Sequence, residues 1–361
     1  MANYRLATIL SEKTMGASGT ETIDIKESTP ISRITLQLRA TNNGNTPTEH
    51  PAEIVSKIEL VDGSNVLYSL SGKQARAVAI WGTENQPSDH TYFNDDVQNI
   101  NDFHMYFGRY LWDPDFALDP RKFKNLQLKV TYTRAAGGCS PDALTFAVYG
   151  DIFDEKLVAP RGFLVSKQIY SYTGAASTWE YIDLPTDYTY RQILVEARYT
   201  AVEPYDVVNK IKLVEDNGRK VPIDETSVSS YLKLIAEQYP PLTEWSVINP
   251  GTAGQKGYCM ISYNGVGTIA GREATAVGYG SITEIQGGTY AAIANAAGFF
   301  GVNIIGWIPH GIFPLMITGD KNVPTDWYNP SRIGSLQLQC YGGSSAASTT
   351  TAIIIQQLRP F

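Results

Sequence analysis

The chain has 361 residues, which is enough for two domains of ordinary size, each with its own core. Its net charge of -7 argues against a broad basic surface, so we expect no specific nucleic-acid binding. Charged residues make up 18% of the chain and aromatic residues 11%, a balance that favours a β-rich protein whose surface is partly covered by neighbours.

Residues 1–30 are expected to form an N-terminal arm and a first strand. Gly16 and Gly19 precede an alternation at Ile23 and Ile25. The N-terminus lacks the charged and then apolar pattern of a secretory signal, which predicts a product that stays in the cytoplasm where it is made.

A strand, a hairpin and a helix follow one another from residue 31. Residues 34–41 alternate between apolar and polar, as a half-buried strand requires. In residues 55–67, Asp62 and Gly63 separate two short apolar runs and predict a tight hairpin turn. Residues 74–81 then have a weak helical period that ends at Gly82.

The same series returns in the second half of the chain. Residues 193–200 match 34–41, and residues 208–221 match the hairpin, with Asn217 and Gly218 at its turn. A second helix follows, with Asp224 as the expected N-cap and Pro240 as the stop. Its apolar residues, spaced i, i+3, i+4 and i+7, are Val228, Tyr231, Leu232 and Ile235.

Each series then enters a long variable region and closes with two more strands. The variable regions span about 82–116 and 241–327, and the closing strands are expected at 126–132, 144–152, 336–341 and 352–358. This organisation predicts a first domain at 31–158 and a second at 159–361, with a large insertion at about 241–327. Seven or eight strands and one helix per half predict an all-β fold of two tandem eight-stranded jelly-roll β-sandwiches, each with a short helix.

One stretch has the length of a membrane span. No charged residue lies between Glu284 and Asp320, and residues 299–318 are about 20 in number. Repeated glycine and proline would break a helix there, so buried or interface-facing strands are the better prediction.

The residues that commonly build catalytic or metal sites are scattered. Three cysteines, Cys139, Cys259 and Cys340, are too few and too far apart for a disulfide framework or a zinc site, and we expect free thiols. We expect no cofactor, no catalytic residues and no enzymatic activity. A weak candidate calcium site is Asp95, Asp96 and Asp102, although its spacing does not match an EF-hand loop and a plain polar loop is the simpler alternative.

Aromatic residues cluster in the two variable regions. They either fold back over their own domain or meet another chain, since aromatic residues are enriched at buried interface centres. The interface candidates are Tyr106, Trp112, Trp245 and Trp307.

With these repeated elements, the chain resembles the double jelly-roll major capsid proteins of tailless icosahedral bacteriophages and related viruses. The resemblance rests on residues 34–41, 55–67 and the helix near Gln74, and on the same series at 193–200, 208–221 and 228–236. It covers nearly the whole chain.

The resemblance implies a structural protein that forms pseudo-hexameric homotrimers and tiles an icosahedral virion shell. It also implies synthesis in the host cytoplasm and, as partners, neighbouring trimers, minor capsid or vertex proteins and, in some members, a lipid membrane beneath the shell. The alternative is a carbohydrate-binding or glycoside-cleaving jelly-roll protein. Cleavage would need two carboxylates about 5 to 9.5 Å apart, for which Glu244 and Glu284 are the residues to test.

Overall fold

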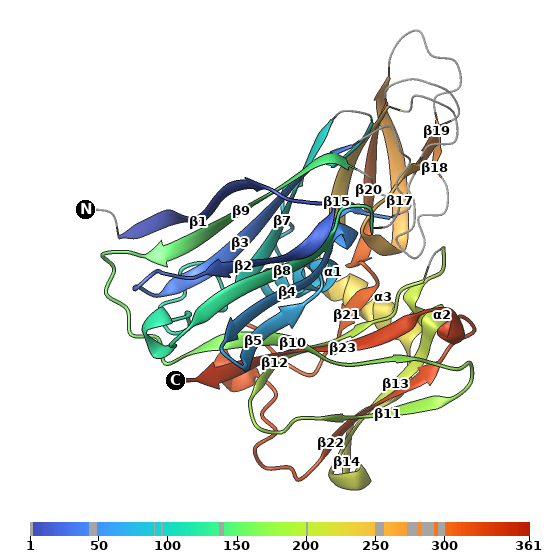
Figure 1. Ribbon diagram of the computed structural model, residues 1–361. Helices are drawn as coiled ribbons and strands as arrows, with labels where there is room; N and C mark the ends of the chain where they lie inside the picture. Colours follow the sequence, from blue (N-terminus) through green and yellow to red (C-terminus); the bar gives the residue numbers. More distant parts are fainter. Residues whose placement is uncertain are drawn as a thin grey trace.

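The computed structural model describes residues 3–42, 49–89, 91–94, 97–136, 141–199, 201–249, 256–272, 280–282, 292–294 and 300–361. Most of these residues lie in strands, and Figure 1 shows them as two sandwiches joined at the centre of the molecule, with a further sheet on one side. The prediction of an all-β fold is confirmed.

The first sandwich has two facing sheets of four strands. One has the order β1 (Tyr4–Thr14), β9 (Pro141–Phe153), β3 (Ile31–Asn42) and β7 (Gln98–Tyr106). The other has the order β2 (Ser18–Asp24), β8 (Leu126–Thr133), β4 (Val55–Asp62) and β5 (Asn65–Leu70). Ile34, Leu36 and Leu38 of β3 are fully buried between the sheets, as their alternation predicts.

The second sandwich repeats this strand order. One sheet has the order β10 (Gly162–Thr173), β23 (Thr350–Pro360), β12 (Tyr190–Glu196) and β21 (Ile312–Pro314). The other has the order β11 (Trp179–Leu184), β22 (Leu336–Gly342), β13 (Val208–Glu215) and β14 (Lys220–Ser227). By chain order, β10 therefore corresponds to β1, and β14 corresponds to β5.

The two sandwiches share one continuous sheet. β5 pairs in parallel with β10, with Tyr68 opposite Ser166 and Ser69 opposite Lys167. The resulting eight-stranded sheet has the order β2-β8-β4-β5-β10-β23-β12-β21 and runs through both halves in Figure 1. The sequence analysis predicted two sandwiches but not this connection.

Helix α1 (Gly72–Thr83) lies between the two halves. Its N-cap is Ser71, whose side chain accepts a hydrogen bond from the backbone N–H of Gln74 while the Gln74 side chain accepts one from Ser71. Glu84 ends the helix with a φ of 57°. The helix is thus longer at both ends than the predicted 74–81, and Trp81 Nε1 donates a 2.8 Å hydrogen bond to the carbonyl of Ile312 in the other half.

Helix α3 (Val228–Gln238) is the amphipathic helix of the second half, and it follows the short α2 (Pro204–Val207) in chain order. Its four buried residues are those that the sequence period predicted. The expected N-cap was wrong: Ser227 precedes the helix, because Asp224 still belongs to β14.

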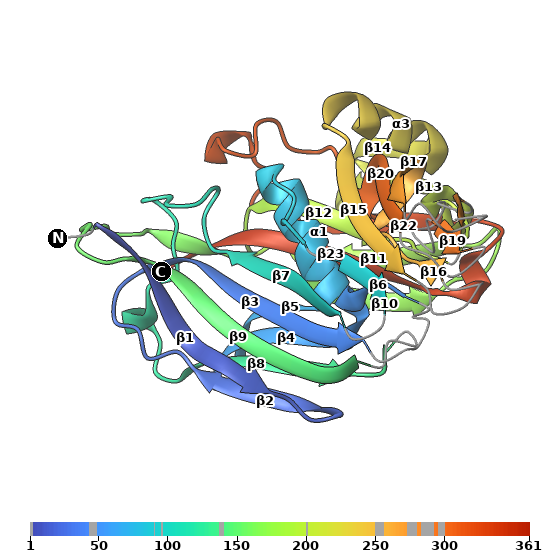
Figure 2. The same cartoon turned by 90° about the horizontal axis from the view of Figure 1, so that it is seen from above.

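The two variable regions meet in a separate sheet beside α1. Its order is β17 (Ile261–Arg272), β20 (Phe300–Pro309), β15 (Leu242–Asn249) and β6 (Thr91–Asn94). β6 comes from the first half and pairs in parallel with β15. A smaller sheet consists of β16 (Lys256–Gly257), β19 (Ala292–Ala294) and β18 (Gly280–Ile282). Figure 2 shows these strands on the side of the molecule away from β1 and β2.

Three sequence predictions need comment. Residues 1–30 were expected to be an arm with one strand, but they contain two strands, β1 and β2, which pair with β9 and β8. The two closing strands expected in each half are present and lie in facing sheets. The uncharged stretch forms β20 and β21, and none of the helices in the described ranges is long and apolar enough to cross a membrane.

Candidate functional site

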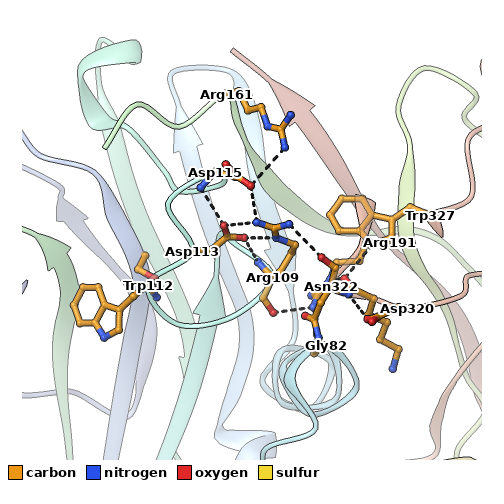
Figure 3. A network of polar contacts seen from close by, with 12 residues as sticks. Gly82, Arg109, Trp112, Asp113, Asp115, Arg161, Arg191, Asp320, Asn322 and Trp327 are labelled. Carbon is orange, nitrogen blue, oxygen red and sulfur yellow. Dashed lines mark hydrogen bonds and ion pairs between the residues drawn. The ribbon is translucent and has the colours of Figure 1, made fainter. Parts of the chain in front are cut away.

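A charged cluster occupies the loop that follows β7. Arg109 donates hydrogen bonds from Nε and NH2 to the Asp113 carboxylate at 2.7 and 2.8 Å, and from NH2 to Asp115 at 2.7 Å (Figure 3). The hydrogen bond to Asp113 raises the pKa of Arg109, so the guanidinium is charged at any ordinary pH. Gly108 has no room for a side chain, because a Cβ atom would lie 2.4 Å from the carbonyl oxygen of Phe116. The backbone conformation of this loop is therefore closely constrained.

Arg191, on β12, connects this loop to the second half of the chain. Its side chain is 1% exposed and donates hydrogen bonds to the backbone carbonyls of Gly82 at 2.6 Å, Arg109 at 2.9 Å and Lys321 at 3.1 Å. It also donates to Gln356 Oε1 at 3.0 Å. Burial lowers the pKa of Arg191 to about 10, which leaves it charged at neutral pH. In Figure 3 Gly82, Arg109 and Asn322 lie close to Arg191, whereas Trp112 lies apart on the left of the view.

A polar cleft of about 670 Å³ lies next to the cluster and is lined by both halves. Its cations are already bonded within the chain: Arg33 donates to Asp151 at 2.7 Å, and Lys321 Nζ donates to the carbonyl of Trp81 at 2.6 Å. Lys321 also lies over the ring of Tyr239, 4.1 Å from its centroid, and burial lowers the pKa of Lys321 to about 8. The cleft therefore lies at a joint between the halves where these cations already have partners within the chain.

A second buried polar cluster lies between α1 and the sheet of the variable regions. His50 Nδ1 accepts a hydrogen bond from the backbone N–H of Ala52 at 3.1 Å, so in the neutral ring the proton is on Nε2. That Nε2 lies 3.3 Å from Glu244 Oε1, and Glu244 Oε2 accepts from the backbone N–H of Met260 at 2.7 Å. Glu244 is 4% exposed and is thus not open to a sugar chain; Glu284, its proposed partner, lies outside the described residues.

Three of the four predicted interface residues contact their own chain. Tyr106 is half-buried, and its hydroxyl accepts a 3.1 Å hydrogen bond from Arg33. Trp307 Nε1 donates to the carbonyl of Tyr239 at 3.1 Å. Trp112 packs against Tyr4 and Phe153, with ring centroids 4.5 and 5.5 Å away. A contact of these residues with another chain stays a prediction.

Trp245 is the exposed member of the set. Its side chain lies on the outer face of β15 and is 56% exposed. Val266 on β17 and Ile305 on β20 are exposed too and lie opposite each other in the same sheet. The variable regions thus present exposed apolar side chains on three strands of one sheet.

The candidate calcium site is not assembled in the described part of the chain. Asp95 and Asp96 lie outside it. Asp102 is on β7, where its carboxylate accepts a 3.0 Å hydrogen bond from Gln37 and burial raises the pKa of Asp102. Among the described residues, no group of three or more His, Cys, Asp or Glu side chains is placed to hold a metal ion. Cys259 and Cys340 are free and buried, as expected, and Cys139 lies outside the described ranges.

Arg109 and Arg191 were not among the predicted site residues. A signal for Arg191 is present, because a single arginine begins the apolar run of β12, whose residues are nearly all buried. An arginine in such a strand needs internal acceptors. The spacing of Arg109, Asp113 and Asp115 similarly suits a local ion-pair cluster.

Comparison with known proteins supports the fold. No protein-family model matches the sequence, and no curated protein matches it. Among solved structures, the STIV MCP, from Sulfolobus Turreted Icosahedral Virus, aligns over 99% of this chain and 96% of its own, with 13% identity and a TM-score of 0.60. The major capsid protein P2 from Bacteriophage PM2 aligns over 99% and 98%, with 11% identity and a TM-score of 0.55. A chain of the PBCV-1 virus capsid aligns over 99% and 94%, with 11% identity and a TM-score of 0.56. The chain has the double jelly-roll fold of these capsid proteins.

Proposed function

We propose that this chain is a structural major capsid protein, which forms homotrimers that tile an icosahedral virion shell. The observation that carries the proposal is the pair of equivalent four-strand-on-four-strand sandwiches, which match the STIV and PM2 capsid proteins over 99% of the chain. A sandwich repeated within one chain gives a trimer six similar building units.

The organisation of the junction agrees with this role. The buried Arg109 and Arg191 are bonded to groups of their own chain and hold the two halves in one orientation. Exposed apolar residues lie elsewhere, as with Trp245 on β15 and Leu6 on the edge strand β1. A subunit that assembles needs a stiff body and an outer surface that neighbours can cover.

The proposal places the protein in the virion, with copies of itself as its main partners. It assigns the chain no catalytic step, and the alternative of glycoside cleavage is not favoured, since Glu244 is buried. Minor capsid or vertex proteins and a lipid membrane under the shell are further partners that the sequence resemblance predicts.

The test is the state of the purified protein. Native mass spectrometry is expected to show a species of three times 39.7 kDa, and negative-stain electron microscopy is expected to show hexagonal tiles or closed particles. A stable monomer that binds an oligosaccharide and forms no particles would contradict the proposal.

A further inference from the structure

The pairing of the two halves leaves two equivalent strand edges unpaired in the described part of the chain. Within the chain, β5 of the first half pairs with β10 of the second half. The strands that correspond to these two are β14 and β1. Both end their sheets, with no strand on the outer side in the part of the chain that the structure describes. Figures 1 and 2 show β14 and β1 at opposite ends of the molecule.

We propose that β14 of one copy docks against β1 of a second copy and so repeats between chains the contact that β5 and β10 make within the chain. The inference rests on the proposed capsid function and specifies the surface by which the copies meet. Such a contact joins two different surfaces, and repeated contacts of this kind close a ring when the rotation allows. Three copies would give six sandwiches with internal and intermolecular contacts in alternation.

The strand registers place Leu6 at the position of a covered residue. In the second half, Ile193 of β12 pairs with Ile355 of β23, and Ile355 pairs in turn with Lys167 of β10. Ser166 is the residue before Lys167. In the first half, Ile34 of β3 pairs with Gly150 of β9, and Gly150 pairs with Ala7 of β1. Ala7 is therefore equivalent to Lys167, and Leu6 is equivalent to Ser166.

Ser166 is covered by β5 and is 1% exposed, whereas Leu6 is 65% exposed. Burial of an exposed leucine side chain contributes about 1.5 to 3 kcal/mol. The free edge therefore carries an apolar residue where the internal contact carries a small polar one.

The opposing edge is found in the same way on β14. Leu60 lies opposite Tyr68, and its counterpart Leu213 lies opposite Ile223. Ile223 and Asp224 therefore take the places of Tyr68 and Ser69. Pro222 has no N–H and Glu225 has a φ of 42°, so β14 cannot form a long ladder. The internal contact is short as well: Tyr68 and Ser69 are the residues of β5 that pair with β10.

A charge pair supports this match. Within the chain, Arg359 NH1 donates a 3.1 Å hydrogen bond to Asn65 Oδ1 across the joint. Asn65 pairs with Asp62 in the first half. In the second half Lys220 pairs with Glu215 at the equivalent position, so Lys220 takes the place of Asn65. Arg359 lies opposite Phe163, and the equivalent residue, directly after β9, is Asp154, whose backbone N–H donates to the carbonyl of Asn3.

The proposed contact thus brings a lysine ammonium to a carboxylate. Both groups are accessible on the single chain, where Lys220 lies 3.2 Å from Glu215 and Asp154 lies 3.4 Å from Arg5. The Arg5–Asp154 pair is exposed and contributes only about 0 to 1 kcal/mol, so its exchange has a small cost. Glu215, the present partner of Lys220, is 6% exposed and keeps a 2.7 Å hydrogen bond from the Tyr328 hydroxyl.

Cysteine crosslinking tests the geometry directly. The variant pair Ala7→Cys and Asp224→Cys occupies neighbouring positions on β1 and β14 in the proposed contact and, in a Cys139→Ser background, is expected to oxidise to disulfide-linked dimers and trimers on a non-reducing gel. The matched control is Lys167→Cys with Ser69→Cys, which lie opposite each other on β10 and β5 and are expected to oxidise within the chain, leaving its mass at that of the monomer. Trimers that form in solution without intermolecular crosslinks at 7 and 224 would overturn the inference.

Charge reversal gives an independent test. Asp154→Lys and Lys220→Glu are each expected to weaken trimer formation by about tenfold, because like charges then meet, and the double variant is expected to restore it. An unchanged urea midpoint shows that each variant still folds. Trimers that are insensitive to both single reversals contradict this contact but leave the capsid function standing, whereas a wild-type protein that neither trimerises nor forms particles contradicts the capsid function itself.

Discussion

Arg191 of β12 donates a 2.6 Å hydrogen bond to the carbonyl of Gly82, the residue before the last in α1. The same guanidinium also bonds the carbonyls of Arg109 and Lys321. Arg191→Met keeps an unbranched apolar stem but removes the guanidinium, which leaves these buried acceptors without donors, each at a cost of about 1 to 3 kcal/mol. We expect the free energy of unfolding to fall by about 3 kcal/mol or more in urea titrations. The control is Arg219→Met at an exposed hairpin tip, with an expected change within about 0.5 kcal/mol.

The two carboxylates that bind Arg109 differ in burial, and this difference predicts unequal effects. Asp113 is fully buried, and its removal leaves the Arg109 charge without its main partner. Asp113→Ala is expected to lower the free energy of unfolding by about 3 to 5 kcal/mol. Asp115→Ala is the matched variant, with an expected loss below about 1 kcal/mol because the Asp115 side chain is 46% exposed. Equal losses in the two variants would show that Arg109 does not depend on the buried pair.

Two of the predicted interface tryptophans are expected to behave differently. Trp112 is half-buried and packs between Tyr4 and Phe153, so Trp112→Ala should reduce stability by about 1 to 3 kcal/mol. Trp245 is exposed, and Trp245→Ser should leave stability within about 0.5 kcal/mol. If Trp245 meets another chain, its variant will form fewer particles in electron micrographs at unchanged stability, and normal assembly would remove Trp245 from the interface.

Two histidines, the half-buried His104 and the buried His310, predict a loss of stability in acid. Burial, with the charges of Arg33 and Arg76, lowers the pKa of His104 to about 4, and burial holds the pKa of His310 well below its usual range. The unfolded chain therefore binds protons to these rings first, so their contribution is full above pH 6.5 and is lost as the pH falls from 6.5 toward 4. Urea midpoints are expected to fall over that window. The fall should be smaller in His104→Gln, while the two proteins should respond alike between pH 7 and 8.

Glu203, just before α2, predicts the opposite trend. Burial raises the pKa of Glu203 to about 7, and the charge of Asp206 adds to this. Because the folded-state pKa lies above the ordinary value of 4.5, the stabilising contribution is present below pH 4.5 and is lost as the pH rises through 7. Glu203→Gln is expected to raise the thermal midpoint relative to wild type at pH 8 but not at pH 4.5. A wild-type advantage at pH 8 would contradict the raised pKa.

Local sequence patterns predicted the elements whose pattern reflects one buried face. Ile34, Leu36 and Leu38 alternate because β3 has one face in the core, and the spacing from Val228 to Ile235 follows the buried side of α3. β1 was not predicted because its side chains are exposed on both faces, apart from the buried Ala7 and two half-buried residues. Its position depends on pairing with β9, which follows more than a hundred residues later.

The contact between the two halves could not be predicted from the sequence, for a related reason. β5 and β10 pair over a short length, and nothing in either strand specifies the other as its partner. The aromatic residues of the variable regions were rightly noticed, but composition alone cannot separate Trp112, packed against its own chain, from the exposed Trp245. Arg191 was missed because an interior cation is rare and its acceptors are backbone carbonyls, which no side-chain motif shows.

The uninterrupted eight-stranded sheet has a mechanical consequence. A hinge between the halves would have to break the ladder between β5 and β10 and withdraw Arg191 from the carbonyls around it. Each chain therefore resists bending at its middle. In a closed shell built from such chains, the curvature must arise from the angles between neighbouring chains rather than from flexing within one.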